Sequence, residues 1–365
     1  MKSLFSLCTV ILWLFGFQGA NAVQSWPGSN LYYAAGLNTV QQDSLLGSLQ
    51  SAGIKVLRVW LDGQTETQKG TNIVPFPSLE PNAIGTYNDT VLERLDDVMV
   101  KAASYGIKLS IAIHSYNALS GGDVYGQAYG TSDFYTNSAA ISSFEQRISH
   151  VLAHVNPHNN KPWSESSEYI FAFEAQNEAM NNKGTDFIAE HAGWQCTVAQ
   201  AIKDGLKNRT DILVTTGGQG WLDVSMQDAY FSCAALDVIA IHAYGAADYD
   251  TSRLAAYVDK AKSSGKKLLM QEWGACYYDT VNNRCNQSGA LDEATRAQNL
   301  RTWAEQISAA GIPWMYWQVI PNADPHWDYD YEIGTPDGDI WEAFKQVALD
   351  TETYEAAFDF SPWLL

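Results

Sequence analysis

The chain has 365 residues, of which 46% are hydrophobic, 12% aromatic and 17% charged, as expected of a folded globular protein. Its formal net charge of −19 excludes nucleic acid and anionic membrane surfaces as natural partners. The charge suits a protein that acts on neutral material.

The first residues have the pattern of a secretory signal. Lys2 supplies the positive start, Leu4 to Phe17 the apolar middle, and Ala20-Asn21-Ala22 a cleavage site. We predict a signal peptide over 1–22 and a secreted, extracellular protein over 23–365. Because the signal contains Lys2 and no acidic residue, its removal makes the net charge one unit more negative. The apolar part is shorter than the ~18 residues of a membrane span, so no membrane anchor is expected. The alternative is a buried N-terminal helix.

A unit of amphipathic helix, glycine and short apolar strand recurs along the chain. It occurs at 48–61, 101–114, 261–274 and 307–320. The glycine suits the left-handed end of a helix, and the apolar run suits a strand that is buried on both faces. Further strands are predicted within 31–38, 169–178, 211–218 and 237–245, with helices between most of them, as at 91–106 and 293–311.

Strands that alternate with helices pair in parallel. Eight such units in one uninterrupted domain predict a (β/α)8 TIM barrel, a single domain with enlarged loops at the C-terminal rim. The alternative is an open doubly wound sheet. That fold usually has a glycine-rich phosphate loop after an early strand, whereas GLNTVQQD follows the first candidate strand here. The tail 351–365 is expected to pack on the outside of the barrel.

Four cysteines remain after the predicted signal, namely Cys196, Cys233, Cys276 and Cys285. An even number in an oxidising compartment favours disulfides. Cys276 with Cys285 would close one short loop, and this favours Cys196 with Cys233 among the three possible pairings. A zinc site is the alternative, but the spacing lacks a C-x-x-C pair. Sequons for glycosylation lie at Asn88, Asn208 and Asn286.

Polar residues collect where the predicted strands end, and a barrel carries its active site at that rim. They are Arg58 in the second strand, His114 in the third, Asn177 and Glu178 in the fourth, His242 and Tyr244 in the sixth, Glu272 and Trp273 in the seventh, and Trp317 in the eighth. Burying unpaired carboxylates is costly. The segment FEAQNEA (173–179) is therefore predicted to enter a solvent-facing cleft.

Two carboxylates at one barrel mouth suggest glycoside hydrolysis, which needs one carboxyl group protonated and the other ionised. Arg58 and Tyr244 could hold one of them ionised by charge and hydrogen bonding. Tryptophans offer flat apolar surfaces on which sugar rings stack. Those at or just beyond strand ends are Trp60, Trp221, Trp273, Trp317 and Trp327.

In this combination of strand-end residues the chain resembles glycoside hydrolase family 5, a family of clan A retaining β-glycanases, over almost all of 23–365. The resemblance implies that Glu178 is the general acid/base and Glu272 the nucleophile. It further implies that Asn177 binds the sugar 2-hydroxyl, that Arg58 and Tyr244 orient Glu272, that His114 and His242 line the cleavage subsite, and that Trp317 forms its floor. From their places at or just beyond strand ends, Trp221 and Trp273 are also expected to bind substrate. The chain departs from many members at Ala179, where they have proline, and at Trp273, where many mannanases have phenylalanine.

We therefore expect a secreted, monomeric, retaining endo-β-glycosidase without cofactor or metal. β-1,4-Mannan is the first choice of substrate and cellulose-like β-1,4-glucan the second, and exo action stays open. A catalytically silent carbohydrate-binding barrel is the alternative from another class. A metallohydrolase is the third hypothesis, with His114, His242 and Glu272 as ligands.

Two further acidic features are interpreted as structural. By strand parity Glu174 points to the same side as Glu178, and it is expected to pair with Arg58. The segment 322–339 is rich in aspartate but has Ile333 where a calcium-binding EF-hand needs glycine. It is predicted to be a solvated loop beside the substrate.

Overall fold

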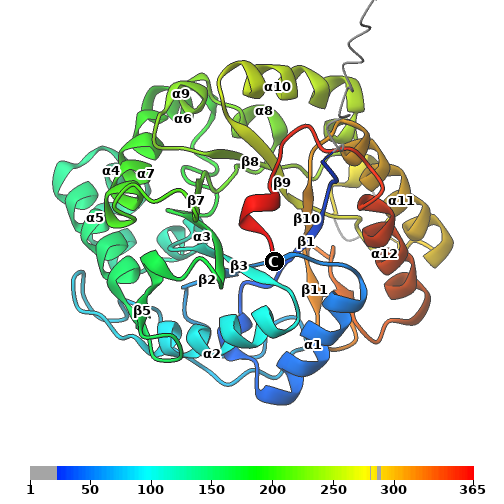
Figure 1. The fold of residues 1–365 in the computed structure, drawn as a ribbon, viewed down its shortest axis with the longest axis horizontal. Helices are drawn as coiled ribbons and strands as arrows, with labels where there is room; N and C mark the ends of the chain where they lie inside the picture. The colour runs from blue at the N-terminus through cyan, green and yellow to red at the C-terminus, as the bar shows by residue number, and fades with distance from the viewer. Residues whose placement is uncertain (1–22, 280, 286–288) are drawn as a thin grey trace, which may run out of the picture.

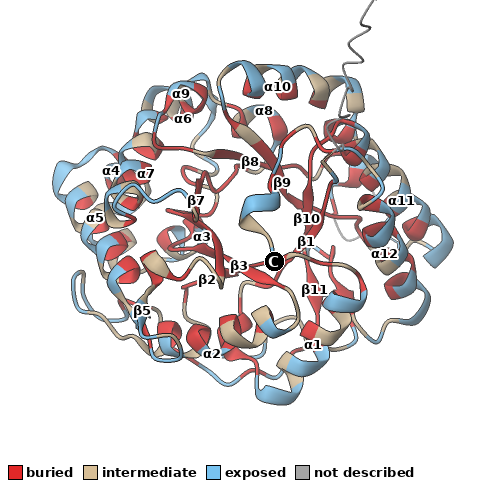
Figure 2. Ribbon diagram, viewed as in Figure 1, coloured by how far each residue is buried: buried red, intermediate tan, exposed pale blue. Residues whose placement is uncertain are grey.

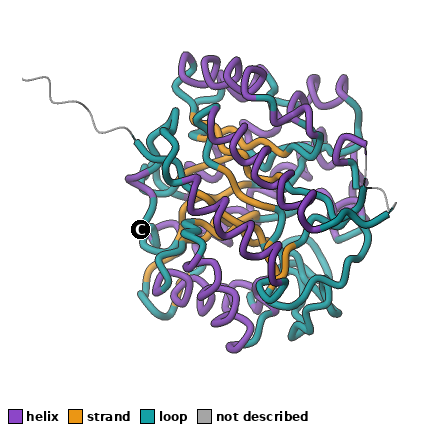
Figure 3. The backbone as a smooth tube through the Cα atoms, turned by 90° about the vertical axis from the view of Figure 1, so that its right-hand side faces the viewer, coloured by secondary structure: helices purple, strands orange, loops and turns teal. Residues whose placement is uncertain are grey.

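The computed structural model describes residues 23–279, 281–285 and 289–365. Parallel strands form a closed barrel in the order β1, β10, β9, β8, β7, β6, β3, β2. Figure 1 shows this barrel with the helices in a ring around it, and Figure 3 shows the strands inside the helical layer from the side. The predicted TIM barrel is confirmed.

The barrel strands are short and fully inside the molecule (Figure 2). They are β1 (Pro27–Asn30), β2 (Val56–Trp60), β3 (Lys108–Ala112), β6 (Ile170–Glu174), β7 (Leu213–Thr215), β8 (Val238–His242), β9 (Lys267–Trp273) and β10 (Trp314–Tyr316). The strand predicted within 31–38 is wrong, because 34–36 form a 3-10 helix. Strand β1 reads PGSN and has no run of apolar side chains. At its second position only glycine fits, because a Cβ at Gly28 would lie 2.6 Å from Met315.

The helices between the strands end where the sequence predicts. Gly53, Gly106, Gly265 and Gly311 follow four of them with φ of 68° to 77°, the left-handed conformation that glycine adopts without strain. The helices are α1 (Thr39–Ser51), α2 (Thr90–Ser104), α3 (Tyr116–Ser120), α4 (Val124–Thr136), α5 (Ser138–Ala153), α6 (Thr185–His191), α7 (Gly193–Gly205), α8 (Leu222–Ser225), α9 (Asp228–Ser232), α10 (Thr251–Ser263), α11 (Glu293–Ala309) and α12 (Gly338–Thr351).

Two strand pairs lie outside the barrel. One joins β4 (Val155–Asn156) to β5 (Lys161–Pro162), and the other joins β11 (Val319–Ile320) to β12 (Ile333–Gly334). The second pair holds the ends of loop 321–332, which follows the last barrel strand. This loop therefore starts and finishes next to the C-terminal rim.

The C-terminal tail covers the opposite end of the barrel. The ring of Phe360 packs on Trp26, which precedes β1, and on Phe171 of β6, with centroids 5.6 and 5.9 Å apart. Trp363 donates a hydrogen bond to the carbonyl of Thr210 over 2.8 Å. The tail thus closes the N-terminal end, where Figure 1 shows it across the barrel's centre, and the C-terminal rim stays open.

The structure contains both predicted disulfides, Cys196–Cys233 and Cys276–Cys285, so these cysteines form no zinc site. No helix in the described part of the chain is long and apolar enough to cross a bilayer. The predicted signal peptide and the sequon at Asn286 lie outside the described residues.

Candidate active site

Glu178, just after β6, and Glu272, in β9, line one hollow of about 770 Å³ at the C-terminal rim. Asn177, Tyr244 and Trp317 line the same hollow. A carboxylate oxygen of Glu178 and one of Glu272 lie within 4.8 Å of each other. The two acids that are ninety-odd positions apart in the sequence thus share one small space.

Arg58 lies beneath this hollow and joins several acidic and polar groups. Its side chain is fully buried and donates two hydrogen bonds to Glu174, from Nε over 3.0 Å and from Nη2 over 2.5 Å. It also donates to Glu272 over 2.5 Å and to Asn177 over 2.7 Å. Burial alone would lower the pKa of Arg58, but the carboxylates of Glu174 and Glu272 outweigh burial and raise it. Both predicted contacts of Arg58 are present.

Glu272 has a donor for each of its oxygens. Arg58 donates to Oε1, and the hydroxyl of Tyr244 donates to Oε2 over 2.7 Å. Burial raises the pKa of Glu272 above its ordinary value, while His242 and Arg58 oppose the rise by favouring the ionised form. The two hydrogen bonds therefore fix the orientation of the Glu272 carboxylate, and Arg58 and His242 favour its ionised form.

His242 lies behind both carboxyl groups and is fully buried, so it does not line the hollow, contrary to the prediction that it lines the cleavage subsite. Its Nδ1 is 3.0 Å from Oε1 of Glu178 and 3.4 Å from Oε2 of Glu272. Its Nε2 is 3.0 Å from the oxygen of Gln271, whose amide nitrogen donates to Glu174. Burial lowers the pKa of His242, but Glu272 and Glu178 outweigh burial and raise it. Acceptors at both ring nitrogens favour a doubly protonated, cationic imidazole.

Glu178 is held in an unusual backbone conformation. Its φ is +49°, and its N–H donates to the carbonyl of Gly217 over 2.9 Å. Asn181 donates to its Oε2 over 2.7 Å. A Cβ at Gly217 would collide with the carbonyl of Gln176, and one at Gly218 would collide with the ring of His242. Only glycine fits at these two positions.

His114 does not reach the hollow, contrary to the prediction that it lines the cleavage subsite. It is 1% exposed, with Nε2 2.7 Å from Asp123 and Nδ1 accepting from Gln176 over 2.8 Å. His114 therefore holds the side chain of Gln176, the residue before Asn177, in place. The alternative of a metal triad is not supported, because among the described residues His242 and Glu272 are grouped with Glu178 rather than with His114.

The predicted stacking role of Trp273 is also wrong. This side chain is fully buried and packs edge-on against Trp314 and Tyr316, with centroids 5.2 and 5.1 Å apart. Successive residues of a strand point to opposite faces. Because Glu272 points to the barrel mouth, Trp273 points into the layer between strands and helices.

Other aromatic rings do line the mouth. Trp221 is 48% exposed there, and Trp317 stacks on Tyr32 with an interplanar angle of 7°. Tyr329 and Tyr331, from loop 321–332, line the hollow as well. Tyr329, Tyr331, Asn181, Gly217 and Gly218 were not predicted from the sequence. The GGQG segment after the fifth barrel strand was the available signal for the glycines. Trp327 is exposed, but it lines neither this hollow nor the second hollow next to it.

A second hollow of about 700 Å³ continues the first. The two share Trp60, Asn117, Trp317 and Tyr329, and the second extends to Gln64 and Lys69. Together they form a groove that runs past the two glutamates.

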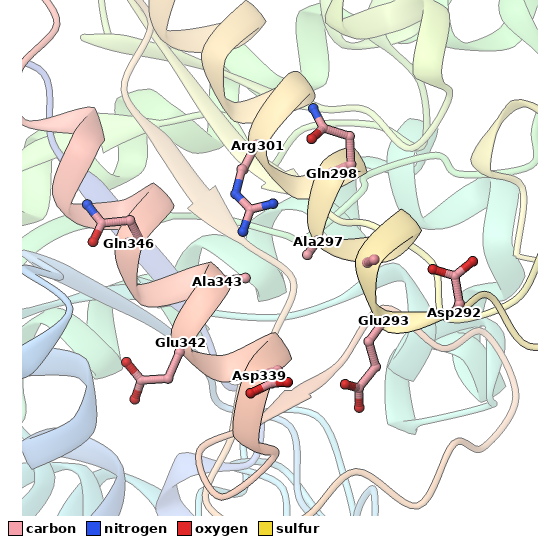
Figure 4. Close-up of a pocket in the computed structure, with 10 residues that line it drawn as sticks. Asp292, Glu293, Ala297, Gln298, Arg301, Asp339, Glu342, Ala343 and Gln346 are labelled. Carbon is pink, nitrogen blue, oxygen red and sulfur yellow. The ribbon is translucent and has the colours of Figure 1, made fainter.

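A separate groove of about 820 Å³ lies between helices α11 and α12 (Figure 4). Acidic and amide side chains line it around Arg301, among them Asp292, Glu293, Asp339 and Glu342. It offers no aromatic ring for a sugar, so the rim groove is the candidate site.

Comparison with known proteins agrees with this geometry. The chain is 28% identical over 275 residues to mannan endo-1,4-beta-mannosidase A of Aspergillus aculeatus, covering 68% of this chain and 69% of that protein. It is 26% identical over 344 residues to mannan endo-1,4-beta-mannosidase F of Aspergillus fumigatus, covering 86% and 72%. The fold matches the crystal structure of the endo-1,4-beta-mannanase from Rhizomucor miehei with a TM-score of 0.66 at 21% identity, covering 92% and 99%. The cellulase family model, glycosyl hydrolase family 5, matches residues 17–323. The chain belongs to glycosyl hydrolase family 5 and is a glycoside hydrolase that acts on O-glycosidic bonds.

Proposed function

We propose that the protein is a secreted, retaining mannan endo-1,4-β-mannosidase. The observation that carries the chemistry is the pair of glutamates at the rim, with oxygens within 4.8 Å of each other. Retaining glycosidases hold their two carboxyl groups about 5–5.5 Å apart, while inverting enzymes need about 6.5–9.5 Å. The names of the Aspergillus relatives support mannan as the substrate.

In the proposed mechanism Glu272 is the nucleophile and Glu178 the general acid/base. Arg58 and Tyr244 each donate to one oxygen of Glu272, which supports an ionised, oriented carboxylate. Glu178 is partly exposed in the same hollow, where it can protonate the departing sugar and then activate water. Asn177 is proposed to bind the 2-hydroxyl of the sugar at the cleavage point, and Trp317 and Trp221 to bind sugar rings.

The shape of the groove supports endo action. Its two hollows are continuous, and the lining includes Trp221 beside the glutamates in the first and Lys69 in the second. A polysaccharide chain can therefore lie across the acids. An exo enzyme would close one side of the groove.

The test is hydrolysis of β-1,4-mannan by wild type, Glu272→Gln and Glu178→Gln. We expect both variants to lose activity by at least about 10³-fold, because each removes a reacting group. The control is Glu342→Gln, an exposed change in the groove of Figure 4, which should leave turnover unchanged. Full activity in Glu272→Gln would refute the nucleophile assignment.

Two further measurements test stereochemistry and substrate. Proton NMR of the first product should show the β-anomer, because double displacement retains configuration. Mannan viscosity should fall before free mannose appears. Faster cleavage of β-1,4-glucan than of mannan would instead favour the cellulase-like alternative.

A further inference from the structure

Loop 321–332 contains two buried carboxyl groups that face each other. The side chains of Asp324 and Asp330 are 1% and 0% exposed. An oxygen of one carboxyl group lies within 4.8 Å of an oxygen of the other. An ionised carboxylate only accepts hydrogen bonds, so two of them in contact repel strongly when water is excluded. A proton or a cation between them removes this repulsion.

These two groups have more acceptor atoms than nearby donors. Asp324 accepts from the N–H of His326 over 3.0 Å, and Asp330 accepts from Nδ1 of the same histidine over 2.9 Å. No donor among the described residues hydrogen-bonds to Oδ2 of Asp324 or to Oδ1 of Asp330, although both atoms are buried. Each carboxylate thus keeps one buried oxygen available for a further ligand.

The neighbouring cations do not fill this gap. Lys69 pairs with Glu332 over 3.2 Å and donates to backbone carbonyls of the loop. Arg296 donates to the carbonyls of Ala275 and Glu332. The positive charges of Lys69 and Arg296 are therefore directed elsewhere. His326 lies beside both carboxylates, with Nδ1 2.9 Å from Asp330 and 3.3 Å from Asp324. When its imidazole is neutral, as in a metal ligand, the two carboxylates keep their excess of negative charge.

His326 completes a set of three possible ligands. One atom from each of Asp324, His326 and Asp330 can be chosen so that all lie within 4.8 Å of one another. Two bonds of about 2.0–2.2 Å to a single ion reach at most about 4.4 Å between ligand atoms. The distances of 2.9 Å and 3.3 Å from Nδ1 of His326 to Oδ2 of Asp330 and Oδ2 of Asp324 lie within this reach. The His326 ring stacks on Tyr277 with centroids 3.5 Å apart, and its side chain is 37% exposed. The ring is thus held in place and also gives an ion a path from solvent.

We propose that Asp324, His326 and Asp330 form a binding site for a divalent cation of the Zn²⁺ or Mn²⁺ class. A set that mixes carboxylates with an imidazole favours these ions over Ca²⁺, which prefers oxygen ligands alone. The site is separate from Glu178 and Glu272. Its role is structural: a bound ion would fix the loop whose Tyr329 and Tyr331 line the catalytic hollow.

A bound ion would also join two loops. The hydroxyl of Tyr278, in the loop after β9, donates to the carbonyl of His326 over 2.8 Å. The N–H of Tyr277 donates to the carbonyl of Asp330 over 2.9 Å. Fixing loop 321–332 therefore also fixes the loop that carries the Cys276–Cys285 disulfide.

The test uses the full, untagged protein after treatment with a chelator and removal of the chelator. Zn²⁺, Mn²⁺ and Ca²⁺ are titrated separately, with binding followed by calorimetry and the melting temperature by scanning calorimetry. We expect Zn²⁺ or Mn²⁺ to bind one per chain and to raise the Tm by about 4 °C at one hundred times Kd. Ca²⁺ should bind at least about tenfold more weakly.

Asp330→Asn should abolish both the binding and the Tm shift, and the exposed Asp328→Asn in the same loop should keep both. Without metal, Asp330→Asn should melt no lower than wild type, because an amide can donate to Asp324. If that variant does not fold, His326→Ala serves in its place. Absence of binding in wild type, or equal binding in Asp330→Asn, would overturn the proposal, the first outcome indicating a shared proton instead of a metal.

Discussion

The hydroxyl of Tyr244 gives the sharpest test of how Glu272 keeps its charge. Tyr244→Phe removes the hydrogen bond to Oε2 of Glu272, which is 2.7 Å long, and keeps the ring that packs on Tyr331. Hydrogen bonds to charged groups contribute about 1.5–3 kcal/mol, and one pKa unit corresponds to about 1.36 kcal/mol. The loss should therefore raise the pKa of Glu272 by about 1–2 units.

The sign of the effect on activity follows from the role of Glu272. The hydrogen bond favours the ionised form, and removing it adds to the rise that burial already causes. Because the nucleophile must be ionised, the acidic limb of the kcat/KM profile should move to higher pH by the same about 1–2 units. The assay is kcat/KM on a soluble manno-oligosaccharide between pH 3 and pH 9 (~0.5-unit steps).

Tyr331→Phe is the matched control. Tyr331 lines the same hollow, but its hydroxyl donates to the carbonyl of Asn283 over 2.8 Å and not to a carboxylate. Its acidic limb should stay in place. If Tyr244→Phe lowers kcat/KM equally at every pH, or moves the limb to lower pH, Tyr244 does not stabilise the ionised nucleophile and the reasoning fails.

Arg58→Met should lower the free energy of unfolding by about 3–5 kcal/mol in denaturant titrations, because Glu174 and Glu272 lose a buried partner; an unchanged midpoint would contradict this. Trp221→Ala should raise KM for mannan several-fold and leave the Tm within about 1 °C, since this ring is 48% exposed in the groove. Trp273→Ala should do the reverse, with a loss of about 3–5 kcal/mol of stability from its fully buried site. A stable Trp273→Ala with a raised KM would restore the stacking role.

The barrel and its two glutamates could be predicted because both depend on a repeating pattern. Apolar strands and helix-ending glycines recur through the chain, and the barrel brings every strand end to one rim. Knowing the fold was therefore enough to bring Glu178 and Glu272 together. The first strand could not be predicted in this way, since PGSN contains no apolar run that would indicate a buried strand.

Strand alternation after Glu272 could have placed Trp273 away from the mouth. The contacts of His242, in contrast, come from local geometry that the pattern does not contain. In the pairing of β8 with β9, Ile241 lies opposite Met270 and His242 opposite Glu272, so the register skips Gln271. This bulge lets Gln271 and Glu272 both reach His242. A register shift of this kind depends on the neighbouring strand, and the sequence of one strand does not reveal it.

Gly217 and Gly218 limit how this enzyme can be engineered. Each leaves space that a neighbour fills, the backbone before Asn177 in one case and the imidazole of His242 in the other. Random mutagenesis should therefore yield inactive clones at two codons whose products offer no side chain to the sugar. A library that aims to alter substrate choice should keep both codons constant and vary the aromatic residues that line the groove.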